Sequence, residues 1–257
     1  MTITSSHNQK LKEIRKLRMR RRWRERDGRF VAEGEDLLAA ADAAGWRAVE
    51  RFCAAGSGMA GVEVEPSVLA SASGLASGTR TLAVYEERWA KRPTGPLCVY
   101  LHGLHDPGNV GAVLRSAQAF GASCVALGPG SADPYGPKAV RASMGAVFAV
   151  PLVRSAAVTE LRGERIALVS GAGVALAELS RLASTPRTRD ATVPADEATR
   201  PVAGPTTLLI GAEREGLPEE VIAQADHIAH IPIHGDSLNA AMAATVALYE
   251  VTRMALG

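Results

Sequence analysis

The chain has 257 residues, of which 47% are hydrophobic, so it can bury a sizeable core in one large domain or two small ones. No apolar run is long enough to cross a bilayer, and the basic N-terminus does not resemble a signal peptide. Three cysteines without CxxC spacing indicate neither a disulfide framework nor a cysteine-based zinc site. We therefore expect a cytoplasmic protein without membrane contact.

Charge is distributed unevenly along the chain, although the net charge is only +2. Residues 1–96 carry 17 Lys and Arg against 12 Asp and Glu, whereas residues 97–257 carry 12 against 15. The basic excess is concentrated in residues 10–29, where eleven basic residues accompany three acidic ones. A basic N-terminal part is typical of a protein that contacts a polyanion.

The basic stretch has apolar residues at about helical spacing, namely Leu11, Ile14 and Leu17. This spacing predicts one helix that stops at the turn Asp27-Gly28, with Trp23 either stacking on a base or packed beneath the helix. Next we expect a strand and an Ala-rich helix over 30–44, strands over 47–55, 62–64 and 81–85, and a small-residue helix before the last of them. Residues 91–96, with two prolines and a glycine, are the predicted linker.

Strands and helices alternate after the linker. A strand over 97–101 is followed by a helix that Asn109 is expected to cap and Gly121 to end. Further strands are expected over 124–127, 147–153, 166–169, 207–210 and 228–233, with a last helix over 237–254. This alternation predicts an α/β fold with a mostly parallel sheet covered by helices. The polar stretch 184–205 is expected to be a surface insertion.

Two short patterns suggest other chemistries and are rejected. Gly171-Ala172-Gly173 follows an apolar run, but a dinucleotide-binding turn needs a third glycine and a following acidic residue, so a plain turn is expected. His227, His230 and His234 lie close in sequence, but their spacing does not place them on one face of a helix or strand. Ordinary hydrogen-bonded histidines are expected there, and no metal site.

Three segments carry the remaining polar residues of interest. Residues 105–117 form a Pro-Gly turn and a helix that carries Arg115, and residues 209–218 form a strand end with an acidic loop bounded by glycines. Residues 231–250 run from Ile-Pro-Ile through Ser-Leu-Asn into an Ala-rich helix. In this order the segments closely resemble the three signature motifs of the SpoU/TrmH branch of the SPOUT methyltransferases, and residues 140–148 resemble that family as well.

The resemblance covers residues 97–257 and implies an α/β methyltransferase domain with a mostly parallel sheet and a C-terminal deep trefoil knot. The basic start and Phe30–Gly34 resemble the small α/β L30e-like RNA-binding domain of rRNA-directed members, here residues 1–92. The resemblance implies transfer of a methyl group from S-adenosylmethionine to a ribose 2′-oxygen of RNA, with 23S rRNA as the expected substrate. It also implies a homodimer formed partly through the last helix.

The resemblance also carries residue roles. It implies that backbone groups bind the methyl donor at Gly211, Ile231 and Leu238, since glycines and strand ends allow close approach. It implies that the catalytic residues are Asn109, Arg115, Glu213, Ser237 and Asn239. RNA contacts are expected from Arg141, by resemblance, and from the basic start at Arg20, Arg21 and Arg22.

Two of these roles need a physical qualification. A guanidinium stays protonated in proteins, so we expect Arg115 to bind the adjacent phosphate and the nascent 2′-oxyanion rather than to act as the base. A single residue separates Gly235 from Ser237, where the family usually has about three, and this shorter loop can displace the serine. Glu213 and Asn239 can also serve as structural caps.

Three functions remain open at this stage. The first is rRNA ribose 2′-O-methylation, in housekeeping or in resistance to a ribosome-targeting antibiotic. The second is tRNA methylation, against which the additional N-terminal domain speaks. The third is a non-catalytic RNA-binding protein of the same fold, against which the presence of Asn109, Arg115, Glu213 and Asn239 together speaks.

Overall fold

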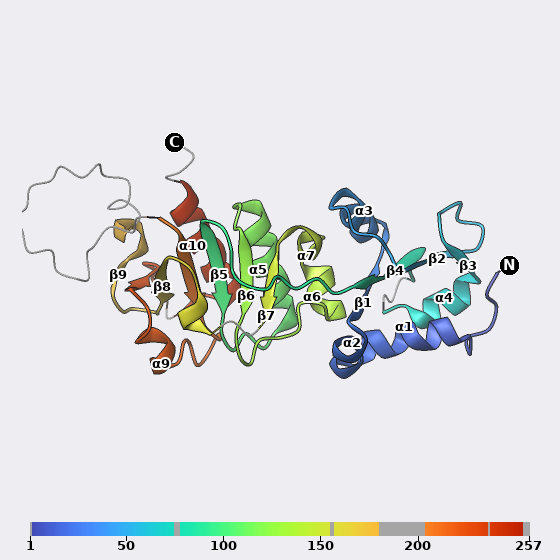
Figure 1. Ribbon diagram of the computed structural model, residues 1–257, viewed down its shortest axis with the longest axis horizontal. Helices are drawn as coiled ribbons and strands as arrows, with labels where there is room; N and C mark the ends of the chain where they lie inside the picture. The colour runs from blue at the N-terminus through green and yellow to red at the C-terminus, as the bar shows by residue number, and fades with distance from the viewer. Residues whose placement is uncertain (1, 75–77, 155–156, 180–203, 236, 254–257) are drawn as a thin grey trace, which may run out of the picture.

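The computed structural model describes residues 2–74, 78–154, 157–179, 204–235 and 237–253. These residues form an elongated molecule with two β-sheets, the first at the N-terminal end and the second nearer the C-terminal helix (Figure 1). No helix in the described ranges is long and apolar enough to cross a membrane. Most of the predicted insertion lies outside the described residues.

The first sheet has four strands in the order β1-β4-β2-β3, with β4 antiparallel to both of its neighbours. Leu11, Ile14 and Leu17 are buried in one apolar cluster with residues of this sheet, which confirms the predicted apolar stripe. The elements of this part are α1 (Gln9–Met19), α2 (Arg21–Asp27), β1 (Arg29–Glu33), α3 (Glu35–Ala43), β2 (Glu50–Ala54), β3 (Val62–Val64), α4 (Pro66–Ala72) and β4 (Thr81–Glu86).

The prediction of one unbroken basic helix is wrong. The chain is extended at Arg20, with φ −141° and ψ 122°, so α1 and α2 are separate helices. The break lets the buried Arg24 side chain point inward, where its Nη1 donates to Leu17 O over 2.6 Å. Apolar periodicity cannot predict this break, because the residue that anchors α2 is charged. Gly28 ends α2 with φ 61°, as predicted.

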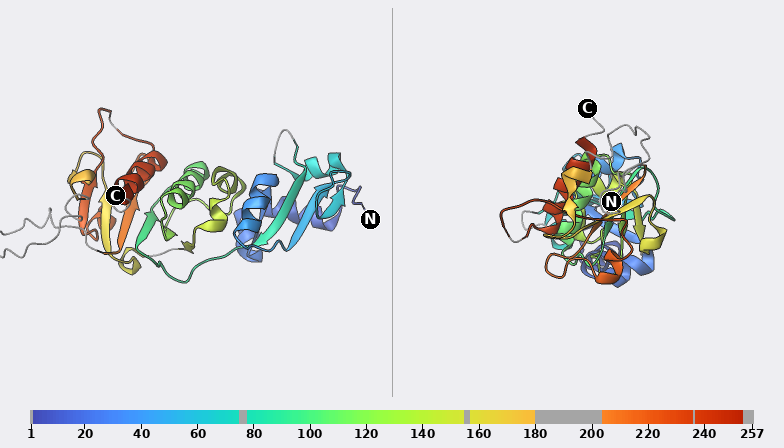
Figure 2. Two further views of the ribbon diagram at one scale, coloured as in Figure 1. Left: turned by 90° about the horizontal axis from the view of Figure 1, so that it is seen from above. Right: turned by 90° about the vertical axis from the view of Figure 1, so that its left-hand side faces the viewer.

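The second sheet has seven strands in the order β7-β6-β5-β10-β8-β11-β9, and its neighbouring strands are parallel, which confirms the predicted sheet. Helices α5 and α10 lie side by side against it (Figure 2). Its elements are β5 (Leu97–Leu101), α5 (Pro107–Ala119), β6 (Cys124–Leu127), α6 (Pro137–Ala142), α7 (Ala146–Ala149), β7 (Leu152–Arg154), the 3₁₀ helix η1 (Val158–Glu160), β8 (Glu164–Leu168), β9 (Val174–Ala175), β10 (Thr206–Ile210), α9 (Glu219–Ile222), β11 (His227–His230) and α10 (Ala240–Arg253).

Three predicted boundaries in this part are wrong. Asp106, rather than Asn109, caps α5: its Oδ1 accepts hydrogen bonds from the backbone N–H groups of Gly108 and Asn109. The strand expected over 147–153 is instead a short helix, α7, followed by β7. The strand expected over 228–233 ends at His230. Pro232 follows two residues later and lacks the backbone N–H that a further sheet hydrogen bond would need.

An aromatic cluster joins the two sheet-bearing parts of the chain. Phe30 of the first sheet lies 4.5 Å from Tyr135 and 5.9 Å from Phe148, measured between ring centroids. Trp46 Nε1 donates a 2.7 Å hydrogen bond to Phe148 O in buried surroundings. One continuous apolar core therefore extends from the first sheet to the second, so the two parts hold a fixed relative position.

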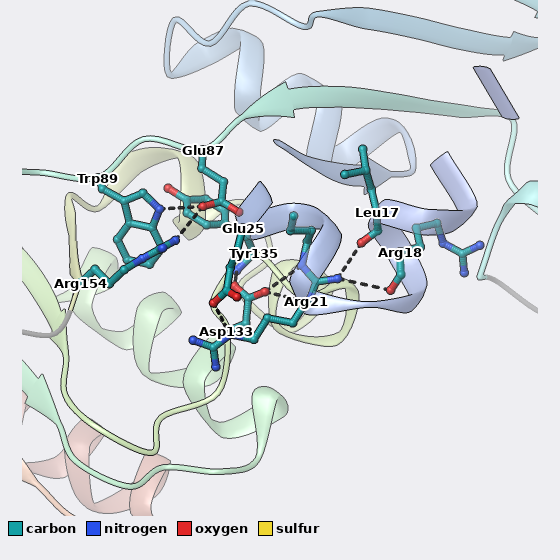
Figure 3. A network of polar contacts seen from close by, with 10 residues as sticks. Leu17, Arg18, Arg21, Glu25, Glu87, Trp89, Asp133, Tyr135 and Arg154 are labelled. Carbon is teal, nitrogen blue, oxygen red and sulfur yellow. Dashed lines mark hydrogen bonds and ion pairs between the residues drawn. The ribbon is translucent and has the colours of Figure 1, made fainter. Parts of the chain in front are cut away.

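A polar network lies beside this aromatic cluster (Figure 3). Arg24 forms a buried ion pair of 2.7 Å with Asp133, which precedes α6. Tyr135 Oη donates to Arg88 O over 2.6 Å, and burial, as the main cause, raises the pKa of Tyr135. Glu87 accepts from Trp89 Nε1 at 2.7 Å and pairs with Arg154. These bonds fix the segment that leads from the first part into the second.

Candidate active site

Two adjoining cavities lie at the carboxyl ends of the central parallel strands. The chain leaves β5 toward β6 on one side and later returns through β10 on the other, so this edge contains a topological switch point, where α/β proteins bind ligands. The larger cavity has a volume of about 550 Å³, which is the size of a cofactor site. Its walls include Leu168, Ile210, Gly211, His230, Ile231 and Leu238.

The larger cavity gathers the residues expected to bind the methyl donor. Gly211, Ile231 and Leu238 all line it, and so does Ser237. Gly211 has no room for a side chain, because a Cβ there would collide with the backbone of Gly216 and Leu217. The loop after β10 folds back on itself at this point, where Ala212 and Gly216 exchange backbone hydrogen bonds of 3.1 and 3.0 Å.

The second cavity, of about 500 Å³, holds a trio of polar side chains. Asn109 Nδ2 donates to Glu213 Oε1, and Asn239 Nδ2 donates to Asn109 Oδ1 over 3.2 Å. The loop residues 212–215 line both cavities, so the trio borders the larger cavity directly. Residues more than 100 positions apart in sequence thus form one site, which brings together three of the five predicted catalytic residues.

Asn239 has a second contact in addition to the trio. Its Oδ1 accepts from the backbone N–H groups of Ala241 at 3.0 Å and Met242 at 3.3 Å, which caps the start of α10. Its amide group therefore connects the first turn of α10 with Asn109 on α5. The predicted double role of Asn239 is consistent with this geometry.

Asp106 lies in the second cavity and was missed in the sequence reasoning. It caps α5 and forms a 2.8 Å ion pair with Lys138 of α6. The hydrogen bond from Lys138, more than any other contact, lowers the pKa of Asp106. The sequence Asp106-Pro107 indicates Asp106 as the helix cap, since an acidic cap followed by proline is a common helix start.

Not all predicted residues meet at the cavities. Arg115 is exposed on α5 and lines neither of these two cavities. Arg141 is partly exposed at the end of α6, near the N-terminal part of the chain. Arg20, Arg21 and Arg22 are exposed around the α1–α2 break.

Trp23 lies inside this basic surface as a partly buried residue. The cationic groups of Lys16, Arg22 and Arg26 approach its ring to 5.0, 5.4 and 4.0 Å from the centroid. It packs against the first apolar core, so the structure favours the packed orientation over a free stacking surface.

The chemistry of the larger cavity fits S-adenosylmethionine. The apolar Leu168, Ile210 and Leu238 suit an adenine ring. Glu213 and Glu215 together outweigh Arg214, which lies between them in the same lining, and this excess of negative charge suits a cationic sulfonium. His230 lines the same cavity with a buried Nδ1 atom that has no hydrogen-bond partner among the described residues. The nearby His227 has its Nε2 atom 2.9 Å from Glu164, while its own Nδ1 is likewise buried without a partner among the described residues.

The structure thus places a cofactor-sized cavity and a polar trio at the carboxyl ends of a parallel sheet, which defines an α/β protein with a small-molecule site. Residues 96–249 match the model of the SpoU rRNA Methylase family, and the chain belongs to that family. Residues 8–91 match the model of an MRM3-like substrate binding domain.

Individual relatives support the same assignment. The chain is 26% identical over 263 residues to the 23S rRNA (guanosine(2553)-2′-O)-methyltransferase RlmP of Bacillus subtilis, with 97% of this chain and 98% of the relative covered. It is 38% identical over 149 residues to a 23S rRNA (uridine(2479)-2′-O)-methyltransferase of Streptomyces viridochromogenes, covering 57% and 49%. The crystal structure of an AdoMet-bound rRNA methyltransferase from Sinorhizobium meliloti matches with a TM-score of 0.82 at 28% identity, covering 100% and 99%.

Proposed function

We propose that this protein transfers a methyl group from S-adenosylmethionine to a ribose 2′-oxygen of ribosomal RNA. The observation that carries the proposal is the polar trio of Asn109, Glu213 and Asn239 at the border of a cofactor-sized cavity. The full-length relative from Bacillus subtilis is named for this reaction on 23S rRNA, which supports the same substrate class here. An rRNA substrate is consistent with the cytoplasmic location predicted from the sequence.

The residues that would hold the methyl donor lie just after β10, just after β11 and just before α10. Gly211, Ile231 and Leu238 would offer backbone groups, while apolar side chains would enclose the adenine. When bound, S-adenosylmethionine supplies an electrophilic methyl group on a sulfonium. The narrow turn at Gly211 keeps backbone atoms close to the cavity, so a side chain at this position would displace the loop.

The trio would position the reacting ribose. Transfer requires the 2′-hydroxyl to lie in line with the methyl group, and fixed hydrogen bonds reduce the entropic cost of that alignment. Asn109 and Asn239 are held in place by one hydrogen bond between them, and Glu213 by its contact with Asn109. Although Arg115 lines neither cavity in the single chain, we propose that it stabilises the developing 2′-oxyanion and the adjacent phosphate once RNA is bound, while the proton leaves to that phosphate or to water.

We further propose a division of labour between residues 1–92 and residues 97–257. The first would bind RNA through the basic surface around Arg20, Arg21 and Arg22, and the second would carry out the transfer. The match of residues 8–91 to a substrate binding domain supports this division. The shared apolar core would hold the RNA-binding surface at a fixed distance from the cavities.

A homodimer is also proposed, with α10 as part of its interface. One face of this helix carries three exposed apolar residues at the spacing of an apolar stripe. The exposed fractions of Met242, Val246 and Tyr249 are 62%, 40% and 54%. Light scattering on the full chain would give a dimeric mass, and Val246→Glu would convert it to a monomer. A monomeric mass for the unmodified chain at micromolar concentration would contradict the dimer.

Ribosomal RNA from cells with and without the gene tests the proposed reaction. A 2′-O-methylated ribose resists alkaline cleavage, so we expect one or a few newly resistant positions in rRNA when the gene is present. New resistance in tRNA alone would overturn the substrate class. A new modification confined to bases would overturn the ribose assignment.

A further inference from the structure

A second group of cations lies where the N-terminal part meets the catalytic part, outside both cavities. Arg18 of α1 and Arg141 of α6 both approach Gly74: a Cβ on this glycine would collide with the Arg18 guanidinium and lie 3.5 Å from Arg141 Nη1. In Figure 3 the Arg18 side chain points away from the network around Asp133. The two guanidiniums are therefore neighbours across the boundary of the two parts.

This group contains more positive than negative charge. Arg18 forms an ion pair with Glu33, a buried carboxylate that also accepts from Ser73 Oγ at 3.1 Å and Gly74 N at 3.0 Å. No carboxylate in the described part of the chain forms an ion pair with Arg141. One carboxylate, with its hydrogen-bonding capacity already engaged, therefore faces two guanidiniums.

A third cation increases the imbalance. Arg15 donates to Ser6 O at 2.7 Å and Ser71 Oγ at 2.9 Å, which are neutral acceptors. Burial lowers the pKa of Arg18, Glu33 opposes this shift, and the like charges of Arg141 and Arg15 add to it. Like charges gathered at one place are costly unless an anion binds between them.

The group is rigidly connected to the catalytic trio. Helix α6, which carries Arg141, packs so closely on α5 that a Cβ on Gly111 would lie 2.5 Å from Ala139 O and 2.6 Å from Ala142 Cβ. Gly111 lies two residues after Asn109 on α5. One helix-packing distance of about 8–10 Å therefore separates α6 from the helix that positions the trio.

We propose that Arg18 and Arg141 together bind one phosphate of the RNA substrate, near the nucleotide that is methylated. Arg18 Nε pairs with Glu33 and Arg18 Nη1 donates to Ala72 O, so its Nη2 group is the one that faces Gly74 and Arg141. A phosphodiester fits because its two free oxygens can accept from Arg18 Nη2 and from the Arg141 guanidinium while its charge offsets the excess. The phosphate then links the N-terminal part to α6 and sets the register of the RNA relative to Asn109. This site rests on the proposed function, since it presupposes an RNA substrate.

The salt dependence of RNA binding tests the site. The probe is a fluorescein-labelled RNA hairpin of mixed sequence, titrated with the full-length protein between 50 and 200 mM salt. Each neutralised phosphate contributes about 0.7 to 0.9 to the slope of log K against log salt. Arg141→Gln should reduce that slope by about this amount, so the unmodified protein loses about three-fold more affinity than the variant over this range.

Matched variants separate a shared phosphate from a general charge effect. Arg47→Gln removes the same charge from an exposed residue outside the group and should leave the slope unchanged. Arg18→Gln is combined with Glu33→Gln so that no buried charge is left unpaired. The triple variant Arg18→Gln, Glu33→Gln, Arg141→Gln should lose the slope contribution of one phosphate in total, about 0.7 to 0.9, because both guanidiniums bind the same phosphate.

Three results would overturn the site. The first is an unchanged slope of log K against log salt in Arg141→Gln, and the second is the same reduction in Arg47→Gln as in Arg141→Gln. The third is a reduction equivalent to two phosphates in the triple variant. Calorimetric titration with S-adenosylmethionine distinguishes this failure from that of the proposed function. A protein that binds the donor and the hairpin, but with an unaltered slope in Arg141→Gln, contradicts only the phosphate site, whereas one that binds neither contradicts both.

Discussion

Asn239 provides a way to separate the structural and catalytic roles of one side chain. Its Oδ1 caps α10, while its Nδ2 donates to Asn109 across 3.2 Å. Replacement by alanine removes both contacts, and the lost cap alone costs about 1 kcal/mol of unfolding free energy. For a chain of this length that corresponds to a fall in Tm of about 2–4 °C.

Asn239→Asp removes one role and keeps the other. An aspartate oxygen still caps the helix, and its charge favours the helix N-terminus, so the unfolding free energy should stay within about 0.5 kcal/mol of the unmodified protein. The donor to Asn109 is lost, and the new carboxylate faces Glu213. We expect turnover to fall about ten-fold or more, equivalent to about 1.4 kcal/mol in the barrier.

The assay compares urea unfolding with methyl transfer to rRNA for the alanine, aspartate and serine variants. Serine is the uncharged control, because it also caps but cannot reach Asn109 with an amide. We expect a loss of activity in all three variants and a clear loss of stability in the alanine variant alone. An aspartate variant that is both stable and fully active would refute the positioning role of Asn239.

Three further predictions concern the donor cavity, the proposed reacting arginine and the helix cap. Gly211→Ala should weaken S-adenosylmethionine binding at least ten-fold in calorimetry, because a Cβ displaces the loop at Gly216; unchanged affinity would contradict the assigned cavity. Arg115→Lys keeps the charge but loses the planar fork, so near-normal turnover in rRNA methylation would speak against its proposed role. The pKa of Asp106 is lowered by Lys138, so its stabilising contribution is complete above the ordinary pKa of about 3.9 and is lost as the pH falls through the folded value. Unfolding monitored between pH 2 and 6 should show less acid destabilisation in Asp106→Asn, and identical pH profiles would contradict this.

Local patterns predicted most elements of the fold. The buried parallel strands β5 and β6 are short apolar runs, and β10 ends in one, because both faces of each strand are covered. The start of α5 was misplaced because Asn109 and Asp106 are both good caps, and only the backbone geometry shows that Asp106 has this role. Short elements such as α7 contain too few residues to display a period.

Contacts between distant residues could not be predicted from periodicity. The break at Arg20 depends on Arg24 reaching Asp133, a residue more than 100 positions away. The trio around Asn109 was expected only through the family resemblance, since nothing local connects it with Glu213. The trefoil knot implied by that resemblance stays a prediction, as does the reacting role of Arg115.

The central claim is methyl transfer to a ribose 2′-oxygen of rRNA. The most direct measurement uses purified protein, S-adenosylmethionine with an isotopically labelled methyl group, and unmodified 23S rRNA, followed by digestion and mass spectrometry of the nucleosides. We expect the label in one 2′-O-methylated nucleoside, with no incorporation by the Asn109→Ala variant. Label found on a base, or no incorporation by a protein that binds both donor and RNA, would contradict it.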